Sequence, residues 1–387
     1  MEEKDGKHFF LSGPAGTGKT FVYKTICYRC HLEGWIVLCV ASSGIMALLL
    51  PGGQTSHMMF KIPVMSLTEL STCSITKESM LANLIQQTHL IIWDEVAMQH
   101  RFRPEAVDRT CHDIQNDDRP FDGITVVFGG DFQQTLPVIP KGSRLQIVES
   151  CLCRSSLWES VQTLHLYQNM RLERGGDSEE FASWLLGVGH SDGIDVRDGK
   201  INIPGHMRCN SLISLIDFVY PGISSQESPL PEYFLDWMIL TPQNKEVHEI
   251  NQFVLDCFQG DERVFLSADS IIDDEGSPSN QLPSEYLCSI NSSNLPPSEL
   301  RLKPGCPVIL LQNLAPAQGL CNGTRMTIFR MSDHVLKAQI IGGDHHEEVV
   351  FIPRLSLTPS SSEGKLAFTL VSTTTSISNT TCFHNVH

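Results

Sequence analysis

The sequence predicts an α/β fold in which helices cover both faces of a parallel sheet, and three observations lead to this prediction. The chain opens with an apolar run at 9–11, a glycine-rich loop at 13–20 and a helix-like segment at 21–31. Further apolar runs at 90–93 and 124–128 end in acidic or polar residues. Short apolar runs that alternate with helical stretches are typical of parallel sheets, whose ligands gather at the carboxyl ends of the strands.

A second α/β region and a β-rich module follow along the chain. Strand-like segments at 163–167 and 237–241, the second followed by a helix-like segment, repeat the opening pattern. Residues 259–300 are rich in Ser, Pro, Asp and Asn, which is typical of a linker or a long surface loop. Short strand-like runs then fill 307–352, with Asn322-Gly323 as a tight-turn signal. The length of 387 residues also suggests two or three domains.

The charge is strongly acidic but unevenly distributed. The net charge is -16. Residues 1–170 carry 14 basic and 17 acidic side chains, 171–300 carry 7 and 22, and 301–387 carry 7 and 5. Because the acidity is concentrated in the middle of the chain, either end can still line a groove for a nucleic acid. No stretch reaches the roughly 18 consecutive apolar residues of a membrane span, and residues 1–7 are mostly charged, so we expect no transmembrane segment and no signal peptide.

The glycine-rich loop predicts a P-loop NTPase. GPAGTGKT fits the pattern G-x-x-x-x-G-K-[ST] after a strand and before a helix, which is the context the motif requires. Backbone N–H groups of such a loop close around phosphates, Lys19 brings a positive charge to them, and the Thr20 hydroxyl can bind Mg²⁺. The alternative is a glycine turn that binds nothing. The expected cofactors are ATP and Mg²⁺, and the expected nucleotide-binding residues are Gly13, Pro14, Ala15, Gly16, Thr17, Gly18, Lys19 and Thr20.

Two carboxylates follow the apolar run at 90–93. We expect Asp94 to hold Mg²⁺, and Glu95 to orient and deprotonate the attacking water. The alternative is a pair of acids that cap the next helix. A neutral amide in GGDFQQ can sense the γ-phosphate or the water, and Gln134 is the preferred candidate over a plain polar loop.

Arg171 lies just past the start of the second α/β region. An arginine that reaches across an interface between two lobes can neutralise charge in the transition state. From spacing alone, a surface salt bridge is the favoured interpretation of Arg171.

Taken together, the segments resemble the Pif-type helicases (petite integration frequency) of superfamily 1, and most closely the helicase module of Helitron transposons. The matching segments are GPAGTGKT, ASSGIMALLLPGGQTSH, LIIWDEVAMQH, VVFGGDFQQTLPVIPKGSR and LYQNMRL, in this order. Two later segments, MILTPQNKEVHEIN and LKPGCPVILLQNLAPAQGLCNGTRMTI, resemble the second RecA-like lobe of that family and its inserted small β-barrel.

This resemblance implies a P-loop NTPase with RecA-like parallel sheets, in which the second lobe is incomplete and carries a small inserted β-barrel. The expected segments are a first, ATP-binding lobe at 1–162, a partial second lobe at 163–258, a linker or loop at 259–300, the β-barrel at 301–355, and a divergent, disordered tail at 356–387.

The resemblance also implies an activity, which is ATP-dependent movement from 5′ to 3′ along single-stranded DNA. It favours an arginine finger over a salt bridge for Arg171. It also implies that a loop contacts the DNA strand, and the residues of this loop are Ser42, Ser43, Gly44, Thr55 and His57. Without it, this loop would be a capped helix N-terminus. A monomer in the nucleus, with roles in DNA repair, recombination and telomere maintenance, is implied as well.

The sequence departs from the family pattern at both ends. A Gln-containing motif that helps to hold adenine is expected before residue 8, and motifs V and VI are expected after a strand like 349–355. From Thr369 the chain instead contains 9 Ser or Thr in 19 residues. These departures predict a truncated protein that does not unwind duplex DNA.

Two other functions stay open. One is a truncated, non-unwinding remnant that binds ATP or DNA, which DNA-stimulated phosphate release would separate from a helicase. The other, a P-loop kinase for a small molecule, is less favoured because GGDFQQ and the β-rich module would then have no role.

Overall fold

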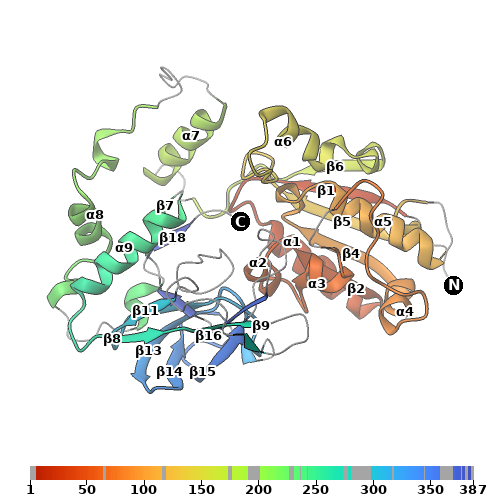
Figure 1. The fold of residues 1–387 in the computed structure, drawn as a ribbon. Coiled ribbons are helices and arrows are strands. Elements are labelled where there is room, and N and C mark those ends of the chain that lie inside the picture. The colour runs from red at the N-terminus through yellow and green to blue at the C-terminus, as the bar shows by residue number, and fades with distance from the viewer. Residues whose placement is uncertain are drawn as a thin grey trace. The chain divides into compact units, whose positions relative to one another are not determined.

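The chain forms two compact units in a computed structural model, one within residues 1–206 and one within 207–386 (Figure 1). The structure describes residues 6–63, 67–115, 119–172, 177–190, 201–225, 231–235, 237–241, 243–272, 278–279, 298–315, 318–343, 345–357, 369–375, 377–379 and 382–384.

The first unit is built on a six-stranded sheet in the order β3-β2-β4-β5-β1-β6. Every neighbouring pair in this sheet is parallel, as the sequence predicts. The strands are β1 (His8–Ser12), β2 (Ile36–Ala41), β3 (Gln54–Thr55), β4 (Thr88–Asp94), β5 (Thr125–Gly130) and β6 (Val161–His165). β1 lies between β5 and β6, so the phosphate loop that follows it leaves the sheet beside the ends of both.

Helices cover both faces of this sheet, because alternate residues of its strands enter two separate cores. On β4, Leu90 and Ile92 pack with α1, whereas Ile91 and Trp93 pack with α3, α4 and α5. The helices of this unit are α1 (Lys19–Leu32), α2 (Gly44–Leu48), α3 (Ser56–Phe60), α4 (Met80–Gln87), α5 (Phe102–Gln115), α6 (Arg144–Ser150) and α7 (Asp177–His190). This arrangement confirms the predicted α/β fold with helices on both faces.

One strand lies in a different sheet from the one expected. Residues 163–167 were predicted to open the second lobe, but Val161–His165 forms β6, the edge strand beside β1. Four of its five residues are exposed. A mostly exposed edge strand lacks the continuous apolar run of a buried parallel strand, so its sequence gave no reason to place it in the first sheet. The first unit therefore extends beyond the predicted boundary at 162.

The second unit combines a small parallel sheet with a larger antiparallel one. β7 (Ile239–Thr241) pairs in parallel with β18 (Cys382–His384), and β7 shares a core with the helices α8 (Leu212–Val219) and α9 (Asn244–Cys257). The antiparallel sheet has the order β10-β9-β16-β15-β14-β13-β12-β17, and β8 pairs separately with β11. These strands are β8 (Arg263–Leu266), β9 (Ala268–Ile272), β10 (Pro278–Ser279), β11 (Glu299–Leu302), β12 (Pro307–Leu310), β13 (Arg325–Met331), β14 (Val335–Ile340), β15 (Val349–Leu357), β16 (Thr369–Thr375) and β17 (Ile377–Asn379).

The predicted disordered tail at 356–387 is wrong where the structure describes it. β16 pairs with β15 and β9, β17 pairs with β12, and β18 pairs with β7. The Ser- and Thr-rich composition lacks an apolar strand pattern, but Thr is β-branched and suits a strand. β8 and β9 likewise lie within the stretch 259–300 that was expected to be a linker. Residues 280–297 of that stretch lie outside the described residues.

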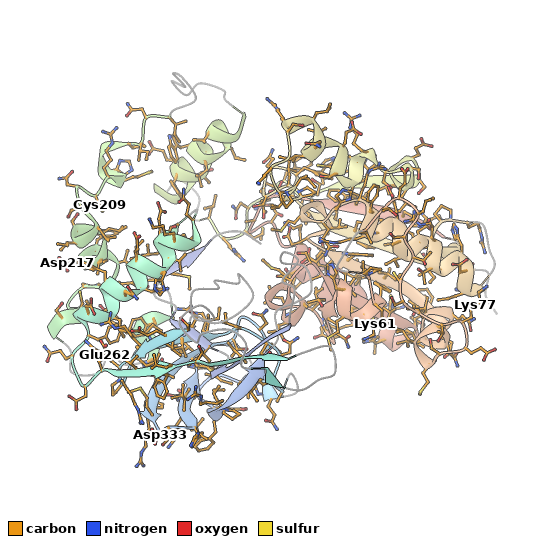
Figure 2. The ribbon with its side chains drawn as sticks, in the orientation of Figure 1. Lys61, Lys77, Cys209, Asp217, Glu262 and Asp333 are labelled. Carbon is orange, nitrogen blue, oxygen red and sulfur yellow. The ribbon has the colours of Figure 1, made fainter. Side chains whose placement is uncertain are left out.

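A single apolar core fills the second unit and joins helix and sheet. It includes Tyr220 of α8, Val254 of α9 and Ile328 of β13. At the surface, Arg301 of β11 forms ion pairs with Asp256 at 2.7 Å and with Glu262 at 2.6 Å, and Glu262 is labelled in Figure 2. No helix in the described part of the chain combines the length and apolar character needed to span a bilayer.

Candidate functional site

The phosphate loop connects β1 to α1, and two of its glycines have backbone angles that other residues rarely adopt. Gly16 has φ of 83° and Gly18, the N-cap residue of α1, has φ of 90°. A Cβ atom on Gly16 would lie 2.4 Å from the side-chain oxygen of Asn169, so this position has no room for a side chain. The loop thus needs glycine both for its turn and for the close approach of another segment.

Lys19 and Thr20 occupy the first turn of α1, at the mouth of this loop. The Lys19 ammonium donates a hydrogen bond to the carbonyl oxygen of Gly13 at 2.6 Å and is nearly buried. The Thr17 hydroxyl donates to the carbonyl oxygen of Pro14 at 2.8 Å. Together these bonds close the loop on itself and hold the ammonium where the phosphates are expected to bind.

Asp94 is the last residue of β4 and Glu95 follows it, and both are nearly buried, with 3% and 7% of their surface exposed. One Asp94 oxygen accepts a hydrogen bond from the Glu95 backbone N–H at 3.0 Å. Burial raises the pKa of Asp94, although the Lys19 charge opposes this rise. Burial and then the Asp94 charge raise the pKa of Glu95 to about 7, again against Lys19. A carboxyl group with a pKa near neutrality suits a general base.

The end of β5 brings a third carboxylate toward Glu95. Asp131 is 7% exposed, and its charge contributes to the raised pKa of Glu95. The Gln134 amide donates a hydrogen bond to Asp131 at 3.3 Å, so the exposed Gln134 is tied to the carboxylate cluster. A Cβ on Gly130 would lie 3.8 Å from the Glu95 Cα, which shows how closely the ends of β4 and β5 approach.

The segment after β6 runs along the phosphate loop. Leu166 donates a backbone hydrogen bond to Ser12, and Met170 donates one to Gly16, both at 2.8 Å. Asn169 accepts a hydrogen bond from the Arg171 backbone at 3.0 Å. The Arg171 Cδ lies 3.2 Å from the point where a Gly16 Cβ would be. The first unit itself therefore brings Arg171 to the phosphate loop, whereas the sequence placed it on the far side of an interface between lobes.

The residues expected to contact DNA lie at the same edge of the sheet. Ala41 of β2 is in register with both Thr55 of β3 and Asp94 of β4, so the loop of Ser42, Ser43 and Gly44 emerges beside the carboxylates. Thr55 caps α3, accepting a hydrogen bond from Met58 at 3.3 Å. α3 ends where Lys61, labelled in Figure 2, takes a left-handed conformation.

His57 adds no positive charge to this loop at neutral pH. Burial and the nearby Arg103 charge lower the pKa of His57 to about 4, so its ring is neutral at neutral pH. The neutral His57 side chain can therefore form a hydrogen bond with a DNA strand but cannot contribute a positive charge.

A buried hydrogen-bond network that sequence reasoning missed connects this loop to β4. The Gln99 amide donates to the Ser56 hydroxyl at 2.9 Å, and its oxygen accepts from the Trp93 ring N–H at 3.2 Å. Ser56 precedes His57, and Trp93 precedes Asp94. Only the burial of Gln99 reveals this network, and a single Gln in a sequence gives no indication that it lies in a core.

The donor set fits Mg²⁺ bound together with a nucleotide. Thr20 offers a hydroxyl oxygen and Asp94 a carboxylate oxygen, and these are the ligand types that Mg²⁺ prefers. One Glu95 oxygen is buried without a hydrogen-bond partner among the described residues, so it remains available to a bound water. The described residues hold no cluster of three or more His, Cys, Asp or Glu that would chelate a metal unaided. Mg²⁺ typically relies on only one or two carboxylates plus phosphates and waters.

Comparisons with known proteins identify two regions of this chain. Residues 1–199 match the family described as PIF1-like helicase, and residues 285–331 match the 2B domain of the DNA helicase Pif1. The ATP-dependent DNA helicase Pif1 of Psychrobacter sp. is 26% identical over 83% of this chain and 44% of its own length. The ATP-dependent DNA helicase RRM3 of Saccharomyces cerevisiae is 25% identical over 91% of this chain and 44% of its own length. The chain thus spans less than half of either relative.

Solved structures show the same fold. A structure of Bacteroides Pif1 bound to single-stranded DNA is 19% identical, with a TM-score of 0.66 over 98% of this chain and 79% of that one. The Pif1 helicase of Candida albicans is 21% identical, with a TM-score of 0.61 over 98% and 82%. The family match covers just over half of the chain and includes the phosphate loop, both carboxylates and Arg171. This chain belongs to the PIF1-like helicase family.

Proposed function

We propose that this chain is an ATP-dependent DNA helicase that couples hydrolysis to movement from 5′ to 3′ along single-stranded DNA. The proposal rests on one observation. At the carboxyl edge of one parallel sheet, the Lys19 ammonium lies close enough to Asp94 and Glu95 for its charge to act on both carboxylates. The relatives named as ATP-dependent DNA helicases, and the Bacteroides structure with bound DNA, support the same activity.

The residues divide the hydrolytic step between them. The phosphate loop binds the triphosphate, and Lys19 leaves the Gly13 carbonyl to contact the phosphates. Thr20 and Asp94 would hold Mg²⁺, which would supply positive charge against the phosphates. Glu95 accepts a proton from the attacking water through its unpartnered oxygen. Arg171 stabilises the charge that develops in the transition state, and Gln134 orients the water.

Single-stranded DNA is the proposed partner of the loop formed by Ser42, Ser43, Gly44, Thr55 and His57. Small and hydroxyl-bearing residues allow close contact between backbone amides and phosphates. We further propose that the protein acts as a monomer in the nucleus, in DNA repair, recombination and telomere maintenance. Its relation to the helicase module of Helitron transposons is also a proposal, supported by the ordered motifs alone.

Phosphate release from ATP, measured with and without a single-stranded oligonucleotide, tests this function. We expect release that requires Mg²⁺ and increases with DNA. Glu95→Gln should retain nucleotide binding but lose at least about a hundredfold in rate, because an amide cannot accept the proton. Lys19→Ala should lose nucleotide binding. Release that DNA does not stimulate would favour the non-unwinding remnant, and an unchanged rate in Glu95→Gln would move the base elsewhere, with Asp131 the next candidate.

A further inference from the structure

Tyr23 buries a hydroxyl group directly beside the carboxylate site. It lies on α1 one helical turn after Lys19, and its side chain is 0% exposed. A Cβ atom on Gly129 would lie 1.7 Å from the Tyr23 hydroxyl oxygen. β5 therefore has a glycine at a position where a side chain would displace this hydroxyl.

This hydroxyl lies within reach of the Asp94 carboxylate but does not meet it in good hydrogen-bond geometry. Among the described residues, no group lies in hydrogen-bond geometry with the buried Tyr23 oxygen. The position that a Cβ atom would take on Gly129 also lies 3.1 Å from one oxygen of Asp94. A buried hydroxyl that makes no hydrogen bond destabilises a fold, so packing alone would favour Phe at this position. The Tyr23 hydroxyl, a hydrogen-bond donor, and the Asp94 carboxylate, an acceptor, therefore lie on either side of the same point above Gly129.

We propose that Tyr23 is a positioning residue, whose hydroxyl donates a hydrogen bond to Asp94 and fixes this carboxylate for binding of the Mg²⁺–nucleotide complex. The inference rests on the proposed function, since it takes Asp94 as the magnesium ligand. The Asp94 oxygen near Tyr23 already accepts the Glu95 backbone N–H at 3.0 Å. A second donor to the same carboxylate would leave its other oxygen directed at the metal and restrict its rotation.

Tyr23→Phe tests the proposal, because it removes one oxygen and keeps the ring. Tyr28→Phe is the matched control, since Tyr28 lies on the same helix but is 57% exposed. The affinity for a fluorescent ADP analogue is titrated against Mg²⁺ concentration, and in excess EDTA, for the full chain. In Tyr23→Phe the Mg²⁺ concentration at half-maximal effect should rise about tenfold, as expected for one lost hydrogen bond to a charged group. The affinity in EDTA and the melting temperature should not fall.

The outcomes separate this inference from the proposed function. If the unmodified chain shows no Mg²⁺-dependent affinity, Asp94 is not a magnesium ligand and the proposed function fails first. If the unmodified chain depends on Mg²⁺ but Tyr23→Phe has the same dependence as Tyr28→Phe, the positioning role is wrong. Equal losses of affinity with Mg²⁺ and in EDTA, or a lower melting temperature, would also overturn it, because they would indicate a merely structural role.

Discussion

Glu95 has a left-handed backbone, with φ of 53° and ψ of 34°. For a residue with a Cβ atom this conformation costs roughly 1–2 kcal/mol. In an extended strand, consecutive side chains point to opposite faces of the sheet, so Asp94 and Glu95 would separate. The turn at Glu95 ends that alternation, and both carboxylates experience the charge of Lys19. Backbone strain of this kind is concentrated at functional sites, where the surrounding structure maintains it.

His57 makes the stability of the first unit depend on pH. Its folded pKa of about 4 lies below the usual 6.5, so the unfolded chain binds more protons between these values. The stabilising effect is therefore complete above pH 6.5 and is lost as the pH falls toward 4. At pH 5 the unmodified chain should lose about 2 kcal/mol in free energy of unfolding relative to pH 7 from this residue.

Urea unfolding of the full chain at pH 7 and pH 5 measures this effect. His57→Gln, which cannot titrate, should reduce the pH-dependent loss by about 2 kcal/mol. His334→Gln, at an exposed position of the second unit, is the control and should leave the loss intact. An equal loss in His57→Gln and in the unmodified chain would show that other groups cause it.

At the scale of single elements, some could be predicted from the sequence and others could not. The phosphate loop and the acidic end of β4 could be predicted, because each pairs a short apolar run with residues that have few uses other than chemistry. β6 and the strands of the C-terminal stretch could not be assigned, since exposed edge strands and Thr-rich strands lack the apolar pattern of a buried strand. Tyr23 and Asn169 were missed because their roles depend on contacts with glycines distant in sequence.

Gln99 connects three elements, and its removal should destabilise the first unit. Gln99→Leu leaves the Trp93 ring N–H and the Ser56 hydroxyl buried without partners. Each unsatisfied group costs about 1–3 kcal/mol, so we expect the two groups to lower the free energy of unfolding by about 2–6 kcal/mol. Gln87→Leu is the matched control, because the Gln87 side chain is exposed and donates a hydrogen bond to exposed Asn83 at 2.6 Å. A Gln99→Leu variant as stable as Gln87→Leu would mean that water or repacking replaces the network.

At the scale of the whole molecule, the apolar cores divide in the same way as the chain. The first unit contains two apolar cores, one that includes Trp93 and one that includes Tyr23. The core of the second unit consists of residues between Ile216 and Ile377. None of the three includes buried residues from both units. The length of the chain predicts two or three domains, but the sequence did not predict that strands after residue 356 complete the second unit. Which strands pair over a long distance in sequence depends on their tertiary neighbours, which the local sequence does not reveal.

Because the cores are separate, heating the full chain should produce two calorimetric transitions. Nucleotide binds only the first unit, so ADP with Mg²⁺ should shift one transition and leave the other in place. At an ADP concentration about 100 times the dissociation constant, the bound unit gains about 2.7 kcal/mol, which for a unit of this size raises its melting temperature by roughly 5–10 °C. Lys19→Ala should keep both transitions and abolish the shift. A single transition that moves as a whole with ADP would show that the two units unfold as one cooperative body, and their separate cores would then not determine how this chain unfolds.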